Sequence, residues 1–429
     1  MAKVRVLLVM RAKAELREFA ALALAPRRVK ISHPEAVPDF VAVDRSYAPV
    51  PLGRTGSTPR LALATPARSP EFIIRGTVDS SKLDALSEQE GMQVFADPKV
   101  ATFPTCAGDP SVGTTADVAA AIGVAELQAH GMDGSAVAVA VMDTGINMAH
   151  LKARGVSASI NPDVSWSPSG VSGKPGKHKV DHGTMCAYDA LIAAPKATLL
   201  DFPILGSTTP GGSAMDGFLS DALQAYSYLL TRMRASDWKY QATVISNSWG
   251  MYHESWDFPA GHPGRYADNP NHPFNIIVGT LARAGADILF AAGNCGAPCP
   301  DYRCDGVTKH TIMGANAHAD VLTVAGATVK KQRVGYSSQG PSIPGMKHTK
   351  PDISAYTHFS GSQAFGKDEP DSGTSAACPV AAGCVAAIRT RLSPSIIGPA
   401  DFFREIKSDA KQPRGAAGWN RNYGYGIIT

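Results

Sequence analysis

The fold of this chain is decided by Val137-Ala138-Val139-Ala140-Val141-Met142-Asp143-Thr144-Gly145, an apolar run that ends in an aspartate, a threonine and a glycine. A continuous apolar run of this length is typical of a strand that is buried on both faces of a parallel sheet. Open α/β sheets place their functional side chains at the carboxyl ends of such strands. We therefore expect Asp143 to be a buried carboxylate that needs a partner.

Apolar runs of this kind alternate with helical stretches through the second part of the chain. The expected strands are Ala136–Met142, Thr198–Leu205, Thr243–Asn247, Ile288–Ala291 and Val321–Ala325, and the expected helices include Asp216–Arg234 and Phe274–Ala284. Such alternation predicts an α/β fold, in which a mainly parallel sheet has helices on both faces.

Residues 1–105 have a different pattern, which predicts a separate small α+β domain of the ferredoxin-like kind. The expected elements are strands at 3–10, Glu71–Val78 and Met92–Ala96, helices at Ala14–Leu24 and Ser81–Gln89, and a loop with one strand at Ala36–Pro70. Residues 106–115 belong to a polar, exposed stretch and are expected to be a linker, and 116–429 form the second domain. Two domains also suit a chain of 429 residues.

The composition is that of an ordinary globular protein, with 44% hydrophobic and 18% charged residues. A net charge of +4 is too small to indicate a nucleic-acid or membrane partner, and no stretch has the length of a membrane span. The opening apolar run is too short for a secretion signal, so a cytoplasmic location is expected. In that compartment the default state of the seven cysteines is a reduced thiol.

A second motif, from Ser372 through Gly373-Thr374-Ser375 to Gly383, places a serine at the start of an alanine-rich helix. A helix N-terminus offers unpaired amides and a positive dipole end, which suit a nucleophile and the oxyanion it creates. Pro379 is expected in the first turn of this helix, where proline is tolerated. The alternative is a serine that only caps an ordinary helix. The nucleophile interpretation therefore requires a base elsewhere.

His182, in Asp181-His182-Gly183-Thr184, is the candidate base and lies 39 residues after Asp143. Histidine is the natural general base near neutral pH, although a structural histidine is the alternative. Asp143, His182 and Ser375 follow one another in the order Asp, His, Ser. Together they are a much stronger signal than any one of them alone.

These segments resemble those of the subtilisin-like serine proteases, the subtilases, over roughly residues 116–429. The aspartate, histidine and serine segments look like those of the family and stand in its chain order. Further stretches that match the family are Ala291-Ala292-Gly293-Asn294, Ser246-Asn247-Ser248-Trp249-Gly250, Tyr336–Pro341 and Lys350–Ile353.

The resemblance implies a serine endopeptidase acting on a peptide or protein substrate. Ser375 would attack the scissile carbonyl, His182 would take its proton and return it to the leaving amine, and Asp143 would orient the imidazole. Asn294 would hold the oxyanion, with a plain loop amide as the alternative. Ser248-Trp249-Gly250 would form the wall of the primary specificity pocket, unless they are ordinary residues at a strand end.

The resemblance further implies that residues 1–105 are propeptide-like and act as an intramolecular inhibitor. Their extended tail would lie in the substrate groove as an added strand and be cut in the linker. The opposite charges of the two parts favour docking, since residues 1–75 carry 13 Lys and Arg against 6 Asp and Glu. An accessory domain that recruits substrate is the alternative. Without a secretion signal, we expect a narrow intracellular target.

The chemistry requires no cofactor and we expect no catalytic metal. Structural calcium is compatible with the family, but no calcium-loop pattern is visible in the sequence. Cys295, Cys299 and Cys304 follow the expected oxyanion residue and match no closed zinc pattern, so a disulfide or structural thiols are favoured over zinc. The remaining cysteines of this domain are expected to be small buried hydrophobes, and they are Cys186, Cys378 and Cys384.

Two rival functions remain open. The segment Met185-Cys186-Ala187-Tyr188 departs from the family pattern beside the histidine, which favours a non-catalytic subtilase scaffold used for binding or assembly. Asp143-Thr144-Gly145 and Asp371-Ser372-Gly373 resemble the two halves of a pepsin-like aspartic protease. That fold is all-β, and an alanine-rich helix after the second motif argues against it.

Overall fold

Seven parallel strands form the central sheet, in the order β15-β14-β13-β11-β7-β9-β8. β7 (Val137–Met142), whose six residues are all buried, lies inside the sheet between β11 and β9. The other strands are β8 (Ser159–Ile160), β9 (Thr198–Phe202), β11 (Ala242–Asn247), β13 (Ala286–Ala291), β14 (Leu322–Ala327) and β15 (Ile353–Tyr356). The predicted parallel α/β fold is confirmed, and it excludes the all-β aspartic protease.

The structure is a computed structural model that describes residues 2–11, 34, 36–52, 71–102, 110–206, 215–413 and 417–429. The expected helix Ala14–Leu24, residues 106–109 of the expected linker 106–115, and residues 53–70 lie outside the described residues. No helix in the described ranges combines the length and the apolar character needed to span a membrane.

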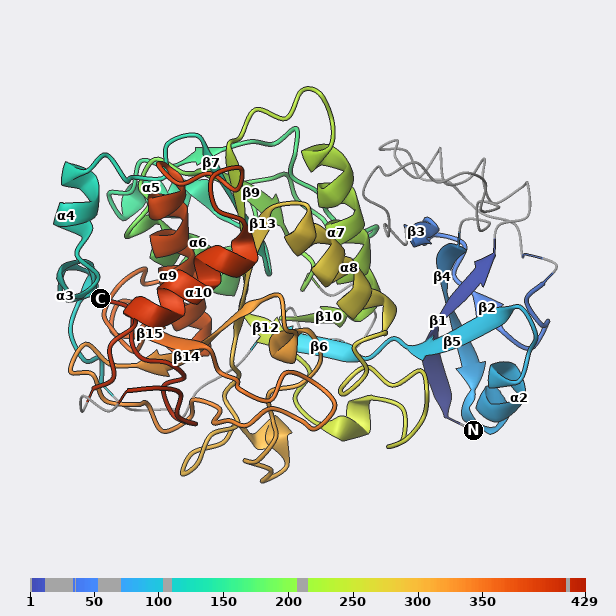
Figure 1. Cartoon of the computed structure of the whole chain (residues 1–429). Coiled ribbons are helices and arrows are strands. Elements are labelled where there is room, and N and C mark those ends of the chain that lie inside the picture. The colour runs from blue at the N-terminus through green and yellow to red at the C-terminus, as the bar shows by residue number, and fades with distance from the viewer. Residues whose placement is uncertain are drawn as a thin grey trace.

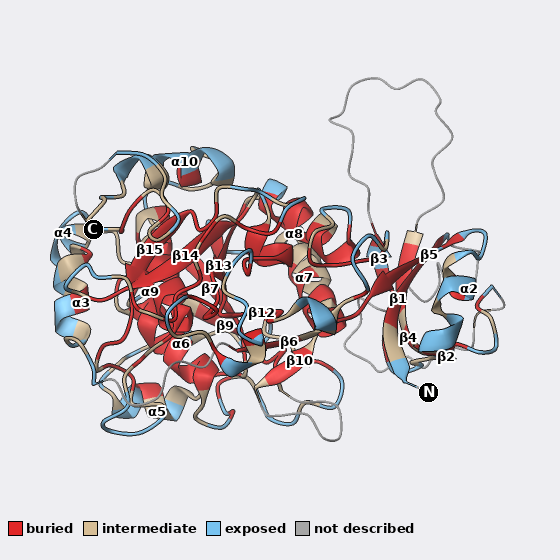
Figure 2. Cartoon of the chain, turned by 90° about the horizontal axis from the view of Figure 1, so that it is seen from below, coloured by how far each residue is buried: buried red, intermediate tan, exposed pale blue. Residues whose placement is uncertain are grey.

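Helices cover both faces of the sheet because β7 alternates its side chains between two cores. Val137, Val139 and Val141 belong to one core, with residues of α6 (His182–Leu191) and α9 (Thr374–Arg389). Ala138, Ala140 and Met142 belong to the other, with residues of α7 (Leu219–Met233) and α8 (Pro273–Arg283). Figure 2 shows that buried residues fill the interior of the α/β domain on both sides of the sheet.

α6 and α9 approach each other so closely that only glycine fits at one point of contact. A Cβ atom on Gly383 of α9 would lie 2.2 Å from the carbonyl oxygen of Ala190 in α6. Since α6 begins with His182 and α9 carries Ser375 in its first turn, this contact sets the spacing of the two elements that hold the expected base and nucleophile. The remaining helices are α3 (Thr115–Ala121), α4 (Val124–Ala129), α5 (Met148–Ala153) and α10 (Pro399–Asp409).

The N-terminal sheet is antiparallel, with the order β2-β4-β1-β5 and β3 paired to β4. This is the order of a ferredoxin-like sheet, as predicted, with its described helix α2 (Leu83–Ser87) shorter than expected and preceded by a 3-10 turn at Ser80–Lys82. The strands are β1 (Lys3–Arg11), β2 (Ala42–Val43), β3 (Val50–Leu52), β4 (Glu71–Asp79) and β5 (Met92–Ala96).

β6 (Lys99–Thr102) leaves the N-terminal sheet and runs into the α/β domain (Figure 1). There it is the middle strand of a three-stranded sheet, antiparallel to β10 (Asp216–Phe218) on one side and to β12 (Trp249–Gly250) on the other. The expected helix Asp216–Arg234 is therefore wrong in its first three residues. Pairing with a strand over a hundred residues away outweighs the local helical pattern there.

Charged residues join the N-terminal sheet to the start of α7. Arg75 of β4 forms ion pairs with Asp44 and, across the interface, with Asp221 of α7 at 2.9 Å. Phe218, the residue before α7, has no side-chain group that could cap the helix. Asp97 caps it instead, since its carboxylate accepts hydrogen bonds from the backbone N–H of Ser220 at 2.8 Å and from its hydroxyl at 3.0 Å.

Candidate active site

Asp143 and His182 meet at the carboxyl end of β7, as predicted. Asp143 follows the strand directly, and His182 begins α6, whose N-cap Asp181 accepts the His182 N–H. His182 Nδ1 lies 2.8 Å from Asp143 Oδ1 and 3.0 Å from Oδ2, and both side chains are buried. A buried carboxylate in this position fixes the imidazole ring and stabilises the cation that forms when the histidine takes a proton.

The turn after β7 holds Asp143 in place. Asp143 Oδ1 also accepts the backbone N–H of Thr144 at 2.7 Å, and the Thr144 hydroxyl accepts the N–H of Gly183 at 2.8 Å. A Cβ atom on Gly183 would lie 2.7 Å from the carbonyl oxygen of Gly145. The glycine of the histidine segment is therefore required because α6 starts in backbone contact with this turn.

Ser375 lies in the first turn of α9 and is fully buried in the chain as described. Its hydroxyl is 3.4 Å from the carbonyl oxygen of Ser248, to which it donates. Within the described ranges, the buried His182 Nε2 has no hydrogen-bond partner. The aspartate-histidine half of the expected triad is thus formed here, whereas the serine-histidine hydrogen bond is not.

The carbonyl oxygen of Ser375 is held by groups outside its own helix. Pro379 lies in the interior of α9, not in its first turn as expected, and it has no N–H to donate to the residue four positions earlier. The Ser375 carbonyl accepts instead from the Ser248 hydroxyl at 2.9 Å and from the Cys186 thiol at 3.5 Å. Because of the interior proline, α9 lacks one helical hydrogen bond, and the two contacts that replace it connect α9 to Ser248 and to α6.

Asn294, which the resemblance implies is the oxyanion residue, lies beside the first turn of α9, where Ser375 is located. It is completely buried, and its Oδ1 accepts the backbone N–H and the hydroxyl of Thr374, each at 3.0 Å. The Thr374 hydroxyl in turn accepts the N–H of Gly293 at 3.0 Å. With its oxygen engaged by Thr374, the amide has a fixed orientation next to Ser375, as an oxyanion donor requires.

Cys186 forms the floor beneath these residues. Its sulfur lies 3.6 Å from Asp143 Oδ2 and 3.7 Å from His182 Nδ1. Burial, with the nearby Asp143 carboxylate, raises the pKa of the Cys186 thiol well above its usual range, so the group stays a neutral packing element. The three residue types could ligate a metal, but the Nδ1 atom already faces the Asp143 carboxylate.

The expected buried character holds for two of the three cysteines for which it was predicted. Cys186 and Cys378 are buried, whereas Cys384 on α9 is partly exposed, and this corrects the expectation for that residue. The divergent segment beside the histidine packs inward as well, with Met185 buried and the Tyr188 hydroxyl 3.2 Å from that of Thr115. It thus fills the core beside α6 without displacing His182.

Ser248, Trp249 and Gly250 follow β11 and border β6. Trp249 pairs with Thr102 and Gly250 pairs with Ala101 in the antiparallel ladder. The Trp249 side chain is fully buried against Phe274 and Phe290, so only its backbone faces the paired strand. The role of these residues in substrate binding remains a prediction.

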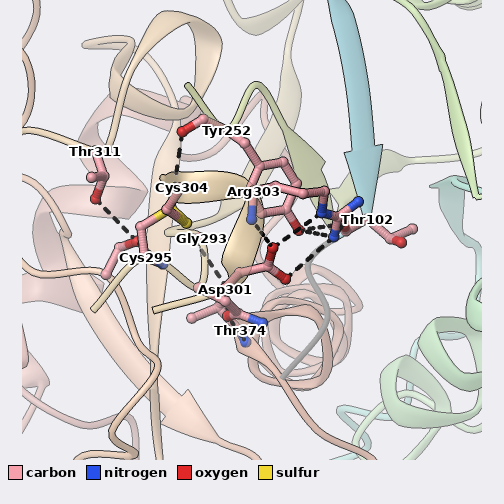
Figure 3. The surroundings of a disulfide bond; sticks show 11 residues. Thr102, Tyr252, Gly293, Cys295, Asp301, Arg303, Cys304, Thr311 and Thr374 are labelled. Carbon is pink, nitrogen blue, oxygen red and sulfur yellow. Dashed lines mark hydrogen bonds and ion pairs between the residues drawn. A yellow bond between two sulfur atoms is a disulfide. The ribbon is translucent and has the colours of Figure 1, made fainter. Parts of the chain in front are cut away.

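A disulfide closes the loop that follows Asn294, between Cys295 and Cys304 (Figure 3). Cys299 is disulfide-bonded as well. The disulfide alternative is thus the one observed, and the default of reduced thiols is wrong for these residues. The loop also carries Arg303, which with Tyr252 contacts the carbonyl of Thr102. The contacts of Arg303 and Tyr252 with β6 were not predicted, because both residues are distant from Thr102 in the sequence and match no motif.

Comparisons with known proteins agree with this geometry. The model of the subtilase family matches residues 134–426. Curated relatives include an endoprotease bli of Onchocerca volvulus, 24% identical over 60% of this chain and 34% of its own length, and the endoprotease bli-4 of Caenorhabditis elegans, 23% identical over 70% and 31%. The chain spans about a third of the length of these relatives.

Solved structures with a similar fold include fervidolysin from Fervidobacterium pennivorans, described as a keratinolytic enzyme related to subtilisin. The match has a TM-score of 0.58 and 15% identity, and it covers 100% of this chain and 60% of that one. Sphericase matches with a TM-score of 0.48 and 21% identity over 69% of this chain and 92% of its own. On the family match and the arrangement of Asp143, His182, Asn294 and Ser375, the chain belongs to the subtilase family.

Proposed function

We propose that this chain is a serine endopeptidase that hydrolyses peptide bonds through Ser375, His182 and Asp143. The observation that carries the proposal is the buried pair of His182 Nδ1 and Asp143 Oδ1 at 2.8 Å, close to a serine in the first turn of α9. His182 Nε2, the atom that has to take the serine proton, is not engaged by another residue of the described chain. The proposed triad requires the Ser375 hydroxyl, which here donates to the Ser248 carbonyl, to donate to this atom instead.

In the proposed reaction, the Ser375 oxygen attacks the carbonyl carbon while His182 Nε2 takes the proton. Asp143 stabilises the imidazolium, and the oxyanion binds to the amide of Asn294, whose orientation is fixed through Thr374. His182 then gives the proton to the leaving amine. Water repeats the sequence and releases the acyl group. No step requires a metal or a cofactor, and structural calcium remains a prediction.

We propose further that residues 1–105 act as an intramolecular inhibitor. β6 is bound as a strand between β10 and β12, next to the Ser248 that contacts Ser375, and this supports a tail that lies in the substrate groove. The capping of α7 by Asp97 and the pair of Arg75 with Asp221 support docking of the small sheet. The location of the cut within the linker 106–115, like the domain boundaries, stays a prediction.

The non-catalytic scaffold is the second candidate, and the open Ser375-His182 contact is the observation that favours it. A serine-directed fluorophosphonate probe decides between the two. Labelling of the wild-type chain, with none in a Ser375→Ala variant, supports the peptidase. A wild-type chain that stays unlabelled after its linker has been cut contradicts it.

The inhibitor role is tested by incubating the full chain and sequencing the N-terminus of the products. Cleavage between about residues 98 and 118 in the wild type alone, followed by a rise in peptidase activity, supports it. An intact and fully active chain contradicts it.

We propose a cytoplasmic location and a narrow intracellular target, as expected from the sequence. The Cys295–Cys304 disulfide weighs against the first, because such bonds are typical of oxidising compartments. Free thiols can be counted after expression in a reducing compartment and after expression in an oxidising one. The comparison tests whether the Cys295–Cys304 disulfide forms only in the oxidising compartment.

A further inference from the structure

The carbonyl oxygen of Thr102 receives hydrogen bonds from two side chains of the α/β domain. Arg303 Nη2 donates to it at 2.7 Å, and the Tyr252 hydroxyl donates to it as well. Arg303 Nη2 also lies 2.5 Å from the Tyr252 oxygen, and its guanidinium stacks over the tyrosine ring at 3.9 Å. The two side chains thus form one unit, in which a cation and a phenol converge on a single backbone oxygen (Figure 3).

The disulfide loop fixes this unit. Asp301 accepts the backbone N–H of Arg303 at 2.8 Å, its Nε at 3.1 Å and its Nη2 at 3.4 Å, so the carboxylate anchors the same edge of the guanidinium that faces Thr102. The backbone N–H of Asp301 donates to the carbonyl of Asn294 at 2.9 Å. The chain from Asn294 to Cys304, closed by the disulfide at Cys295, therefore connects the oxyanion residue to the group that contacts β6.

The hydrogen bonds that both side chains make to the bound strand end on its backbone. Any peptide that pairs with β12 in the register of β6 offers a carbonyl oxygen at the position of Thr102. Ser248 precedes β12 and contacts Ser375, so the strand approaches the nucleophile at its carboxyl end. The Thr102 position therefore lies on the amino side of the bond presented to Ser375.

We propose that Arg303 and Tyr252 are substrate-binding residues that hold the peptide backbone at the position occupied by Thr102. The proposal rests on the proposed peptidase function. It assigns the disulfide loop a role in substrate binding, with Arg303 as the charged donor. Because the contact is to a carbonyl, it favours substrates that extend past this position without selecting a side chain there.

The test uses the full chain, incubated until its own processing stops, and two fluorogenic substrates. One has four residues on the amino side of the cleaved bond, and the other is a single-residue ester that does not reach the Thr102 position. Arg303→Met is compared with Arg283→Met, which changes an arginine that is 61% exposed in its pair with Asp320. Tyr252→Phe is the second variant, because it removes only the hydroxyl.

For Arg303→Met, we expect KM for the long substrate to rise about 10- to 100-fold, the range of a lost charged hydrogen bond. Tyr252→Phe should raise it about fivefold. The ester and the rate of fluorophosphonate labelling of Ser375 should change less than twofold in both variants, and Arg283→Met should change neither substrate. Equal losses on both substrates, or an unchanged KM for the long one, overturn the proposal.

A second measurement does not depend on catalysis. In a Ser375→Ala background, Arg303→Met should increase hydrogen exchange at Ala101 and Thr102 at least tenfold over Arg283→Met. If the wild type hydrolyses neither substrate, the proposed function fails, and the exchange result alone decides whether Arg303 holds the strand. Unchanged exchange overturns that as well.

Discussion

The floor of the active site is held by apolar and backbone contacts, whereas the face that docks the N-terminal sheet adds charged groups to a shared apolar core. At the floor, α6 and α9 touch through Ala190 and Gly383, and a neutral thiol fills the space under the histidine. At the docking face, Arg75 and Asp97 reach across to α7. Separating the first contact would expose apolar surface to water, at about 25 cal/mol per Å². Charged groups regain hydration when they separate, whereas the apolar residues shared at the docking face, such as Ile73 and Leu223, do not, so opening the second contact has both a charged and an apolar component.

The largest difference between the active site and the docking face is expected when His182, the proposed base, is removed. His182→Ala should lower kcat by about 10⁴- to 10⁶-fold, because triad residues act as a unit. Docking of the N-terminal sheet should be unchanged, since His182 makes no contact with it among those described. Steady-state kinetics on a peptide substrate measures the first effect, and hydrogen exchange in β6 measures the second. Near-native turnover would show that another group is the base.

The next largest effect is expected at the oxyanion residue. Asn294→Ala removes the amide and should lower kcat by about 10²- to 10³-fold with a small change in KM. It also leaves the Thr374 N–H without its acceptor, so some loss of stability is expected. Comparing kcat with the melting temperature separates the two effects. A change in KM alone would argue that Asn294 binds substrate and not the oxyanion.

At the docking face, Arg75→Met should weaken docking about 100-fold, equivalent to about 3 kcal/mol, because it leaves Asp221 buried without its cation. Hydrogen exchange in β6, measured in a Ser375→Ala background, reports the effect. Arg404→Met, which breaks an exposed pair with Asp401, is the matched control and should change nothing. If the melting temperature of the α/β domain fell by the same amount in Arg75→Met and Arg404→Met, the contrast between the active-site floor and the docking face would be wrong.

The last effect concerns pH and the histidine of the docking face, His272. His272 precedes α8, accepts the N–H of Phe274 and faces the carbonyl of Ala96 through Nε2 at 2.9 Å. Burial lowers its pKa to about 4, so between pH 6.5 and 4 the unfolded chain binds a proton that the folded chain excludes. The free energy of unfolding should therefore fall as pH drops through this range, by up to about 3 kcal/mol from this group.

His272→Asn keeps a donor and an acceptor and should remove this contribution. Chemical unfolding at pH 7 and pH 4.5, taken as the difference between wild type and variant, isolates it from buried carboxyls such as Asp257, whose pKa burial raises to about 6. A difference that does not change with pH would contradict the expectation.

The sequence was most informative where the physical cause is local. β7 and its aspartate could be predicted from one apolar run, and the start of α9 from a glycine followed by a serine and an alanine-rich stretch. The strand β10 was missed because its partner β6 is over a hundred residues away, and nothing in Asp216–Phe218 encodes that pairing. Arg303 and Tyr252 were missed for the same reason, since their shared target is the carbonyl of Thr102.

Pro379 limits how the helix that carries Ser375 could be grafted onto another protein scaffold. A helix normally carries its own first turn, and a designer could graft it onto another scaffold as a unit. Here the carbonyl of Ser375 depends on a hydroxyl from the chain after β11 and a thiol from α6. A grafted segment 372–389 would arrive with that oxygen unsatisfied unless Ser248 and Cys186 came with it. A transferable unit therefore needs three segments, which are α9, the residue Ser248 after β11, and Cys186 of α6. They are needed together because Pro379 leaves the Ser375 carbonyl without its helical donor.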